Sequence, residues 1–133
     1  MRNALSLILL AVLLFSAAVL AGCDTRVTMN FTYSNHGDDT VTFSSRVGTT
    51  DDWLDSGIAV PADSHVSTGQ RTVKKDYWFS CVVKDTQNVT LDSIVMTGYE
   101  WKTGSAVTWS WDGATLAPVV YIPGTSEGHY TNF

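Results

Sequence analysis

The chain has 133 residues, 44% of them hydrophobic, and a formal net charge of −5. This length allows one domain of ordinary size, and the apolar fraction is too high for a disordered chain. Eight Lys and Arg against 13 Asp and Glu argue against a nucleic-acid partner, which would require a basic surface. Two cysteines exclude a multi-disulfide scaffold and a Cys-rich zinc site.

The first segment has the pattern of a secretory signal peptide. Arg2 and the amino terminus supply positive charge, and residues 4–20 then run with only Ser6 and Ser16 as polar interruptions. A charged start followed by an apolar run is typical of such signals, whereas a membrane-spanning helix needs about 20 apolar residues. We therefore expect this segment to be cleaved and to lie outside the fold.

The apolar run ends in Leu20-Ala21-Gly22-Cys23. These four residues resemble the lipobox of bacterial lipoproteins. The resemblance implies that Cys23 is thioether-linked to diacylglycerol and that the chain is cut before it, so residues 1–22 would be the signal peptide and 23–133 the mature protein. Two alternatives stay open. One is an ordinary signal cut after Ala21 or Gly22, which would leave Cys23 able to pair with Cys81, and the other is an uncut membrane anchor.

Lipidation predicts a protein held outside the cytoplasm on the cell membrane or the outer membrane of a bacterium. Its partners would be membrane lipid, through Cys23, and an envelope protein or glycan. Each buried CH₂ contributes about 0.8 kcal/mol, so two or three acyl chains anchor a protein stably. The mature chain has a formal charge of −6, and we expect its acidic surface to add nothing to that anchor.

The mature chain favours strands, because β-branched Thr and Val are abundant and apolar residues recur at every second position. Segments 27–34 and 41–47 alternate in this way around the turn residues 35–39, and we expect them to form one antiparallel hairpin. Segment 48–57 reads as a polar loop. A short strand is expected to start at Ile58 and to stop at Pro61, where a turn over 61–64 begins.

Five further strands are expected toward the carboxyl end. Segment 77–84 is apolar on both faces, which indicates a central strand, and segment 89–97 follows it after a turn. A hairpin around Thr103-Gly104 would pair 99–102 with 105–108, and a last strand covers 117–122. From about residue 124 the chain looks like a polar, loosely held tail. One face of these strands is expected to meet the core: Ile94, Met96, Val107, Trp109 and Trp111.

Seven or eight short strands separated by turns predict a single all-β domain over 23–133. An antiparallel β-sandwich, of immunoglobulin-like type, is the favoured architecture, and a small β-barrel is the alternative. The Cys…Trp…Cys spacing of true immunoglobulin domains is absent from the sequence.

Two groups of side chains are candidate binding residues. Tyr99 and Trp101 leave one face of a strand and, with Trp53, could form an aromatic platform for sugar rings or a protein partner; packing between sheets is the other interpretation. Asp51, Asp52 and Asp55 cluster in one segment and could bind Ca²⁺, although they lack EF-hand spacing and solvated loop acids are the simpler explanation.

Candidate catalytic residues are few. Cys81 lies in the most apolar strand, which indicates a buried thiol, and the three histidines, His36, His65 and His129, are scattered. The sequence carries no glycine-rich phosphate loop, zinc-protease motif or nucleophile elbow, so we expect neither catalysis nor a cofactor. The favoured function is a non-catalytic binding or structural module of the cell envelope. The alternatives are a carbohydrate-binding module and a small envelope hydrolase.

Overall fold

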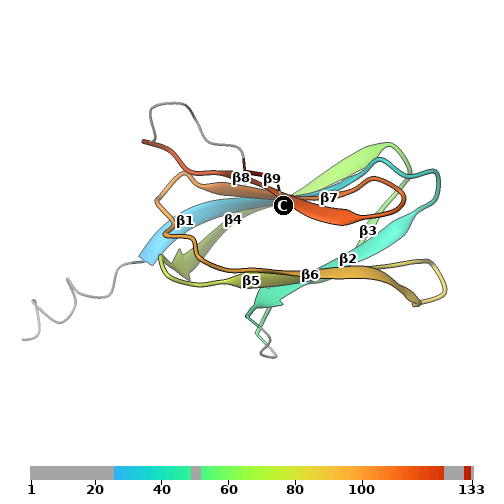
Figure 1. Ribbon diagram of the computed structural model, residues 1–133, viewed down its shortest axis with the longest axis horizontal. Coiled ribbons are helices and arrows are strands. Elements are labelled where there is room, and N and C mark those ends of the chain that lie inside the picture. The colour runs from blue at the N-terminus through green and yellow to red at the C-terminus, as the bar shows by residue number, and fades with distance from the viewer. Residues whose placement is uncertain (1–25, 49–51, 125–130, 133) are drawn as a thin grey trace, which may run out of the picture.

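The computed structural model describes residues 26–48, 52–124 and 131–132 as two β-sheets packed face to face (Figure 1). The larger sheet has the order β4-β1-β7-β8-β9 and the smaller sheet the order β3-β2-β5-β6. The strands of the larger sheet are β1 (Arg26–Asn35), β4 (Ser64–Lys74), β7 (Ala106–Trp111), β8 (Leu116–Tyr121) and β9 (Thr131–Asn132). Those of the smaller sheet are β2 (Val41–Val47), β3 (Trp53–Val60), β5 (Phe79–Lys84) and β6 (Thr90–Met96).

The predicted all-β sandwich is confirmed, and the two separate open sheets replace the barrel alternative. All strand pairs are antiparallel except β1 and β7, which run parallel. The order of the strands differs from that of immunoglobulin constant-type domains, which place the first, second, fifth and fourth strands in one sheet. Within the described part of the chain, no helix is long and apolar enough to cross a membrane.

The expected hairpin between 27–34 and 41–47 is wrong, although both segments are strands. β1 belongs to the larger sheet and β2 to the smaller one, so the chain crosses between sheets after Asn35. The buried Asn35 side chain fixes this crossing: its amide donates to the carbonyls of Asp39 (2.7 Å) and Val60 (3.0 Å), and its Oδ1 accepts the N–H of Gly37 (2.9 Å). Because both strands present apolar residues inward, alternation alone could not separate a hairpin from a crossing.

The expected hairpin around Thr103-Gly104 is also wrong. β6 and β7 lie in different sheets, and the connecting residues include Trp101, which is buried instead of facing away from the core. The core face was predicted correctly, with Ile94 partly buried and the other four residues fully buried: Met96, Val107, Trp109 and Trp111. Val95, on the opposite face of β6, is exposed as expected.

One polar strand and half of another were not predicted. The short strand from Ile58 to Pro61 is confirmed as the end of β3, but β3 begins at Trp53, within the segment 48–57 that was expected to be a loop, and β4 had no predicted counterpart. β4 is an edge strand whose outward side chains reach water, so its sequence carries little apolar alternation. The turn over 61–64 between these strands is confirmed. Of the tail expected beyond 124, residues 131–132 pair with β8 as β9, and residues 125–130 lie outside the described part.

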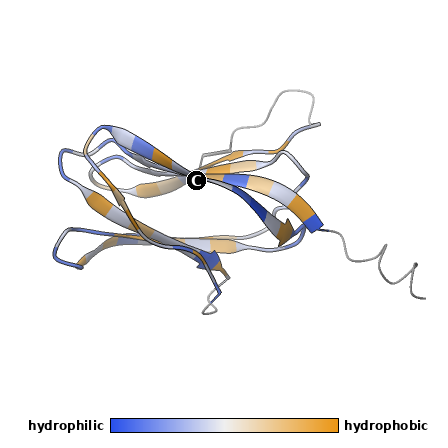
Figure 2. Cartoon of the chain, turned by 180° about the vertical axis from the view of Figure 1, so that it is seen from behind, coloured by the Kyte–Doolittle hydropathy of each residue, from blue (hydrophilic) through white to orange (hydrophobic). Residues whose placement is uncertain are grey.

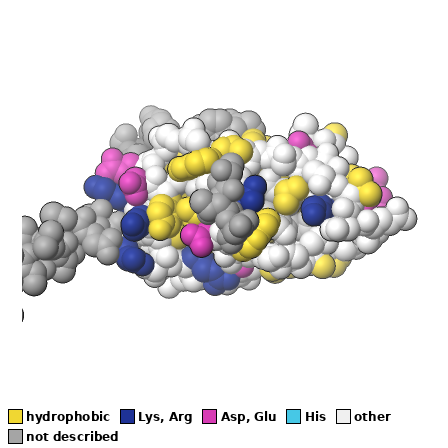
Figure 3. Space-filling view, turned by 90° about the horizontal axis from the view of Figure 1, so that it is seen from below, with side chains coloured by type: hydrophobic (Ala, Val, Ile, Leu, Met, Phe, Trp, Pro, Cys, Tyr) yellow, Lys and Arg dark blue, Asp and Glu magenta, His cyan; other side chains and the backbone are white. Residues whose placement is uncertain are grey.

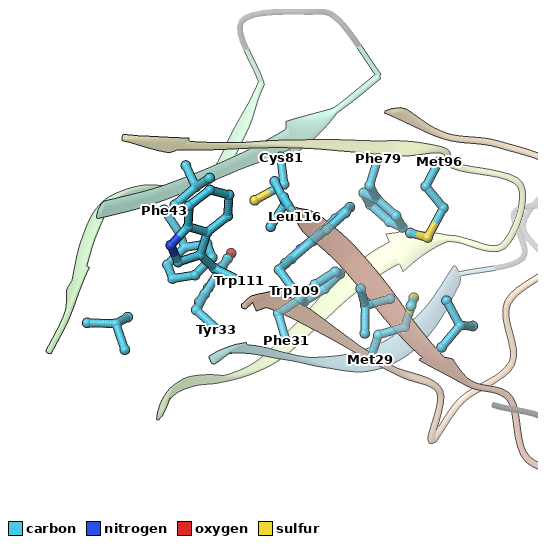
Figure 4. Packing of buried hydrophobic residues seen from close by; sticks show 14 of the residues in the cluster. Met29, Phe31, Tyr33, Phe43, Phe79, Cys81, Met96, Trp109, Trp111 and Leu116 are labelled. Carbon is cyan, nitrogen blue, oxygen red and sulfur yellow. The ribbon is translucent and has the colours of Figure 1, made fainter. Parts of the chain in front are cut away.

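The core fills the space between the sheets (Figure 4). β1 contributes Met29, Phe31 and Tyr33, and such alternation of apolar with polar residues gives the banded pattern in Figure 2. Phe31 meets Phe79 of the smaller sheet edge to face, with ring centroids 5.3 Å apart. Such aromatic pairs contribute about 0.5–1.5 kcal/mol beyond the area they bury. The sheets are therefore joined through large rings from both sides.

Candidate functional site

Some predicted site residues lie outside the described part of the chain. These are the lipobox residues Leu20, Ala21, Gly22 and Cys23, together with Asp51 of the acidic group and His129. Among the described candidates, the structure keeps Tyr99 against Trp101 but places Trp53 elsewhere, and it draws one of the aspartates into the interior.

The aromatic platform does not form. Trp101 is 1% exposed and donates its indole N–H to the carbonyl of Tyr77 at 2.7 Å, and Tyr99 stacks on it with ring centroids 5.0 Å apart. Trp101 also packs against Phe79 of the core. Trp53 lies elsewhere, 47% exposed at the start of β3. The three rings therefore share no surface, and the alternative interpretation, packing in the core, holds for Trp101 and for Tyr99 against it.

Asp55 is the centre of a buried polar cluster that sequence analysis missed. Its Oδ2 accepts hydrogen bonds from the hydroxyls of Tyr33 (2.7 Å) and Thr68 (2.8 Å), and its Oδ1 accepts one from Arg71 Nη2 (2.8 Å). The single Tyr33 proton goes to Asp55, so Ser45 must donate to the Tyr33 oxygen. We call these five residues the Asp55 cluster: Tyr33, Ser45, Asp55, Thr68 and Arg71.

Two glycine bulges place this cluster. Register shifts occur in the pairing of β2 with β3 and of β1 with β4, and a glycine with positive φ lies beside each, Gly57 at 68° and Gly69 at 85°. A bulge adds one residue and reverses which side chains point inward, and glycine adopts positive φ without steric cost. Asp55 and Thr68, each next to such a bulge, thereby meet between two edge strands of different sheets. Gly57 and Gly69 were the sequence signal for this arrangement.

The geometry leaves the Asp55 carboxylate little capacity for a metal. Both oxygens are occupied by donors of the protein itself, and Asp55 is 7% exposed. Asp52 is exposed and lies directly before the first residue of β3. Within the described residues no group of three potential ligands could hold a metal ion. The interpretation of Asp55 as a loop ligand is therefore wrong; it is an interior acceptor that links the two sheets.

Cys81 and Tyr33 have raised pKa values because both are buried in this region. Burial is the main cause for the Cys81 thiol, followed by the charge of Asp55. Burial is also the main cause for the Tyr33 phenol, and the hydrogen bond from Ser45 opposes it only in part. Cys81 is 2% exposed and keeps its proton, so it is a core residue as predicted and a poor nucleophile.

One nucleophile and base do approach each other. Ser34 Oγ lies 3.0 Å from His36 Nε2, and His65 is the cross-strand neighbour of Ser34. Ser34 points away from the core, since its neighbours Tyr33 and Asn35 point inward, and both histidines are exposed. Within the described part of the chain, no carboxylate orients the His36 ring, which a catalytic triad would require.

Two hollows are open to solvent. The larger, of about 390 Å³, lies at the end of the sandwich where β1 stops, and its acidic lining residues are Asp38, Asp39, Asp85 and Asp112. Asp112 accepts the backbone N–H groups of Ala114 and Thr115, which lower its pKa and occupy it within its own turn. The smaller, of about 110 Å³, lies on the outer face of the smaller sheet beside Trp53 and Arg46.

The comparisons with known proteins give no information on the function, which must be inferred from the residues of this chain. No protein-family model matches this sequence, and no curated protein matches it either.

Replacing Asp55 with alanine should destabilise the fold by about 3 kcal/mol, because it strands the Tyr33 and Thr68 hydroxyls and removes the partner of Arg71. Urea unfolding followed by tryptophan fluorescence would measure the change. Asp38→Ala removes an exposed carboxylate outside the cluster and should change the free energy of unfolding by less than about 0.5 kcal/mol. Equal effects of the two substitutions would contradict the assignment of the cluster.

The free energy of unfolding should fall as pH rises above about 9. The Cys81 and Tyr33 pKa values are raised from 9.0 and 10.0, so at high pH the unfolded chain releases protons that the folded chain retains. Stability from these groups is complete below their unfolded pKa values and is lost above them, by up to about 1.4 kcal/mol per pH unit for each group. In Tyr33→Phe the slope above pH 10 should be shallower, as urea titrations at several pH values would detect. An unchanged slope would show that Tyr33 is not the group responsible.

Proposed function

We propose that this chain is a lipid-anchored, extracytoplasmic lipoprotein that serves the bacterial cell envelope as a non-catalytic binding or structural module. The observation that carries the proposal is the sequence Leu20-Ala21-Gly22-Cys23, which directly precedes a folded domain. A thiol at this junction is the nucleophile that accepts a diacylglycerol group, and the small residues before it suit a signal peptidase.

The position of β1 supports the proposal. β1 starts at Arg26, three residues after Cys23, so the acyl group and the domain would be at most about 10 Å apart. β1 is paired with β4 on one edge and with β7 on the other, so the tether cannot lengthen without breaking the larger sheet. The domain would thus lie against the membrane surface.

The chemistry of the described residues supports a non-catalytic role. The Cys81 thiol is buried and protonated, and the Asp55 carboxylate is held by three donors. The Ser34–His36 pair lies on a strand surface, where nothing excludes water from it. These features favour a scaffold over an envelope hydrolase.

Replacing Cys23 with serine should move the protein out of the membrane-anchored, acylated state, because serine lacks the thiol that accepts the lipid. Intact-mass measurement of the purified protein should find a chain starting at residue 23 with added acyl mass for the natural sequence, and no acyl mass for Cys23→Ser. Cys81→Ala is the matched control, since it alters the other cysteine, which is buried, and should keep the acyl mass. An intact leader or an unmodified Cys23 in the natural protein would refute the anchor.

A carbohydrate-binding module is the second candidate, and Trp53 is the residue that favours it. Its exposed indole lies under the guanidinium of Arg46, 5.3 Å from the ring centroid. The small hollow beside it also includes three serines: Ser44, Ser80 and Ser93. An indole face flanked by hydroxyls and a cation suits the apolar face and hydroxyl groups of a sugar ring.

Tryptophan fluorescence titrated with soluble envelope glycans would test this candidate. Binding should shift the emission of the natural protein and should weaken about five- to thirtyfold in Trp53→Ala, since one stacked ring contributes about 1–2 kcal/mol. Val89→Ala, which trims another exposed apolar residue, should bind as the natural protein does. No shift with any glycan would remove the candidate.

A further inference from the structure

The charged residues of the described chain are distributed unevenly between the two ends of the sandwich. We call the end where β1 starts the amino-terminal end; there β4 stops and β5 begins. Four of the seven basic side chains described belong to it: Arg26, Lys74, Lys75 and Lys102. The described acidic residues at this end are Asp52, Asp76 and Glu100. Figure 3 shows several of the dark-blue side chains at its left end, where β1 starts, with magenta acidic side chains beside them.

The fold itself brings these cations together. Arg26 and Lys74 are cross-strand partners on β1 and β4. The 97–105 connection is fixed beside them, because Gly104 donates its N–H to the carbonyl of Thr28 at 2.9 Å, two residues from Lys102. Lys75 pairs with Glu100 at 3.5 Å, but both side chains are largely exposed, so this bridge neutralises little of the positive field.

Aromatic residues lie among the cations. The Lys74 ammonium is 5.9 Å from the Tyr77 ring centroid. Trp78 is 39% exposed and packs one side of its indole on the backbone of Gly48, where an added Cβ would be 3.1 Å from the ring. Exposed Trp and Tyr beside Lys and Arg are typical of side chains at a membrane–water interface, because each has an apolar body and a polar tip.

The opposite end has the reverse charge. Its turns carry Asp38, Asp39, Asp63, Asp85 and Asp112, and the described basic side chain nearest to them is Lys84. The described side chains named here carry a formal charge of +1 at the amino-terminal end and −4 at the opposite end, so the negative charge of the mature chain is spread unevenly. An anionic surface would attract the amino-terminal end and repel the other, which orients the molecule.

We propose that the amino-terminal end is a docking surface for anionic phospholipid, with Arg26, Lys74, Lys75 and Lys102 on the headgroups and Trp78 at the headgroup boundary. The inference rests on the proposed lipid anchor, since Cys23 lies three residues before Arg26 and holds this end near the bilayer. The surface then fixes one orientation of the sandwich, in which the acidic hollow points away from the membrane.

Amine acetylation of the mature, acylated protein on vesicles would test the orientation. The chain has four lysines, three at the docking end and Lys84 at the opposite end as an internal reference. On phosphatidylcholine vesicles containing phosphatidylglycerol at low salt, the acetylation rates of Lys74, Lys75 and Lys102 should fall about fivefold relative to Lys84. High salt should restore these rates, and phosphatidylcholine alone should give a smaller effect. If the anionic vesicles changed the acetylation rate by the same factor at all four lysines, the proposal would be overturned.

Charge reversal gives a second readout. Vesicles with brominated acyl chains quench nearby indoles, so Trp78 should be quenched on the anionic vesicles and Trp78→Phe should lose that quenching. Lys74→Glu/Lys75→Glu/Lys102→Glu should lose it as well, while the matched control Lys84→Glu should keep it. Quenching that ignores the triple change would overturn the docking surface. Failure to float with phosphatidylcholine vesicles would instead refute the lipid anchor, which these lysines do not determine.

Discussion

The structure depends on β1, a strand hydrogen-bonded along both edges. β4 pairs with it over its whole length, β7 pairs with its second half, and its inward side chains Met29, Phe31 and Tyr33 fill the middle of the core. Because each neighbour holds the strand in register, its first residue has a fixed place at one end of the molecule. The point at which the chain leaves the domain toward Cys23 is therefore set by the core, and with it the end that faces the bilayer in the function proposed here.

The sequence was sufficient to predict the fold class but not the strand connections. Alternating apolar residues marked β1, β2, β5, β6 and β7 and the face of each that meets the core, because burial imposes a period of two on any half-covered strand. Which strands pair with each other depends instead on specific side-chain contacts between distant parts of the chain. At Asn35 one buried amide binds three backbone groups and sends the chain to the other sheet, and a single Asn among turn residues predicts an ordinary turn equally well.

The candidate site residues show that local sequence pattern also fails to predict where individual side chains lie. For Trp101 the sequence left an exposed platform and packing in the core both open, and the 97–105 connection decides for the core by folding back over Phe79. Asp55 was expected in a solvated loop and is inside, since a glycine bulge turns it inward. A carboxylate can remain in the interior only where donors surround it. Tyr33, Thr68 and Arg71 supply those donors from two other strands, a coincidence of register that local pattern cannot reveal. The charge difference between the ends was hidden likewise, because Arg26 and Lys74 are distant in sequence and adjacent in space.

The irregular edges of both sheets affect how copies of this protein would interact when they are close together on a membrane surface. β3, β4 and β6, three of the four edge strands, are paired to their neighbours with a register shift, and the fourth, β9, has two residues. Interrupted or very short edges offer poor templates for another strand, which is how soluble sheets avoid joining one another. Molecules confined to a surface collide with their own copies far more often than molecules free in three dimensions. The same bulges that set the Asp55 cluster would thus keep neighbouring copies from polymerising side by side.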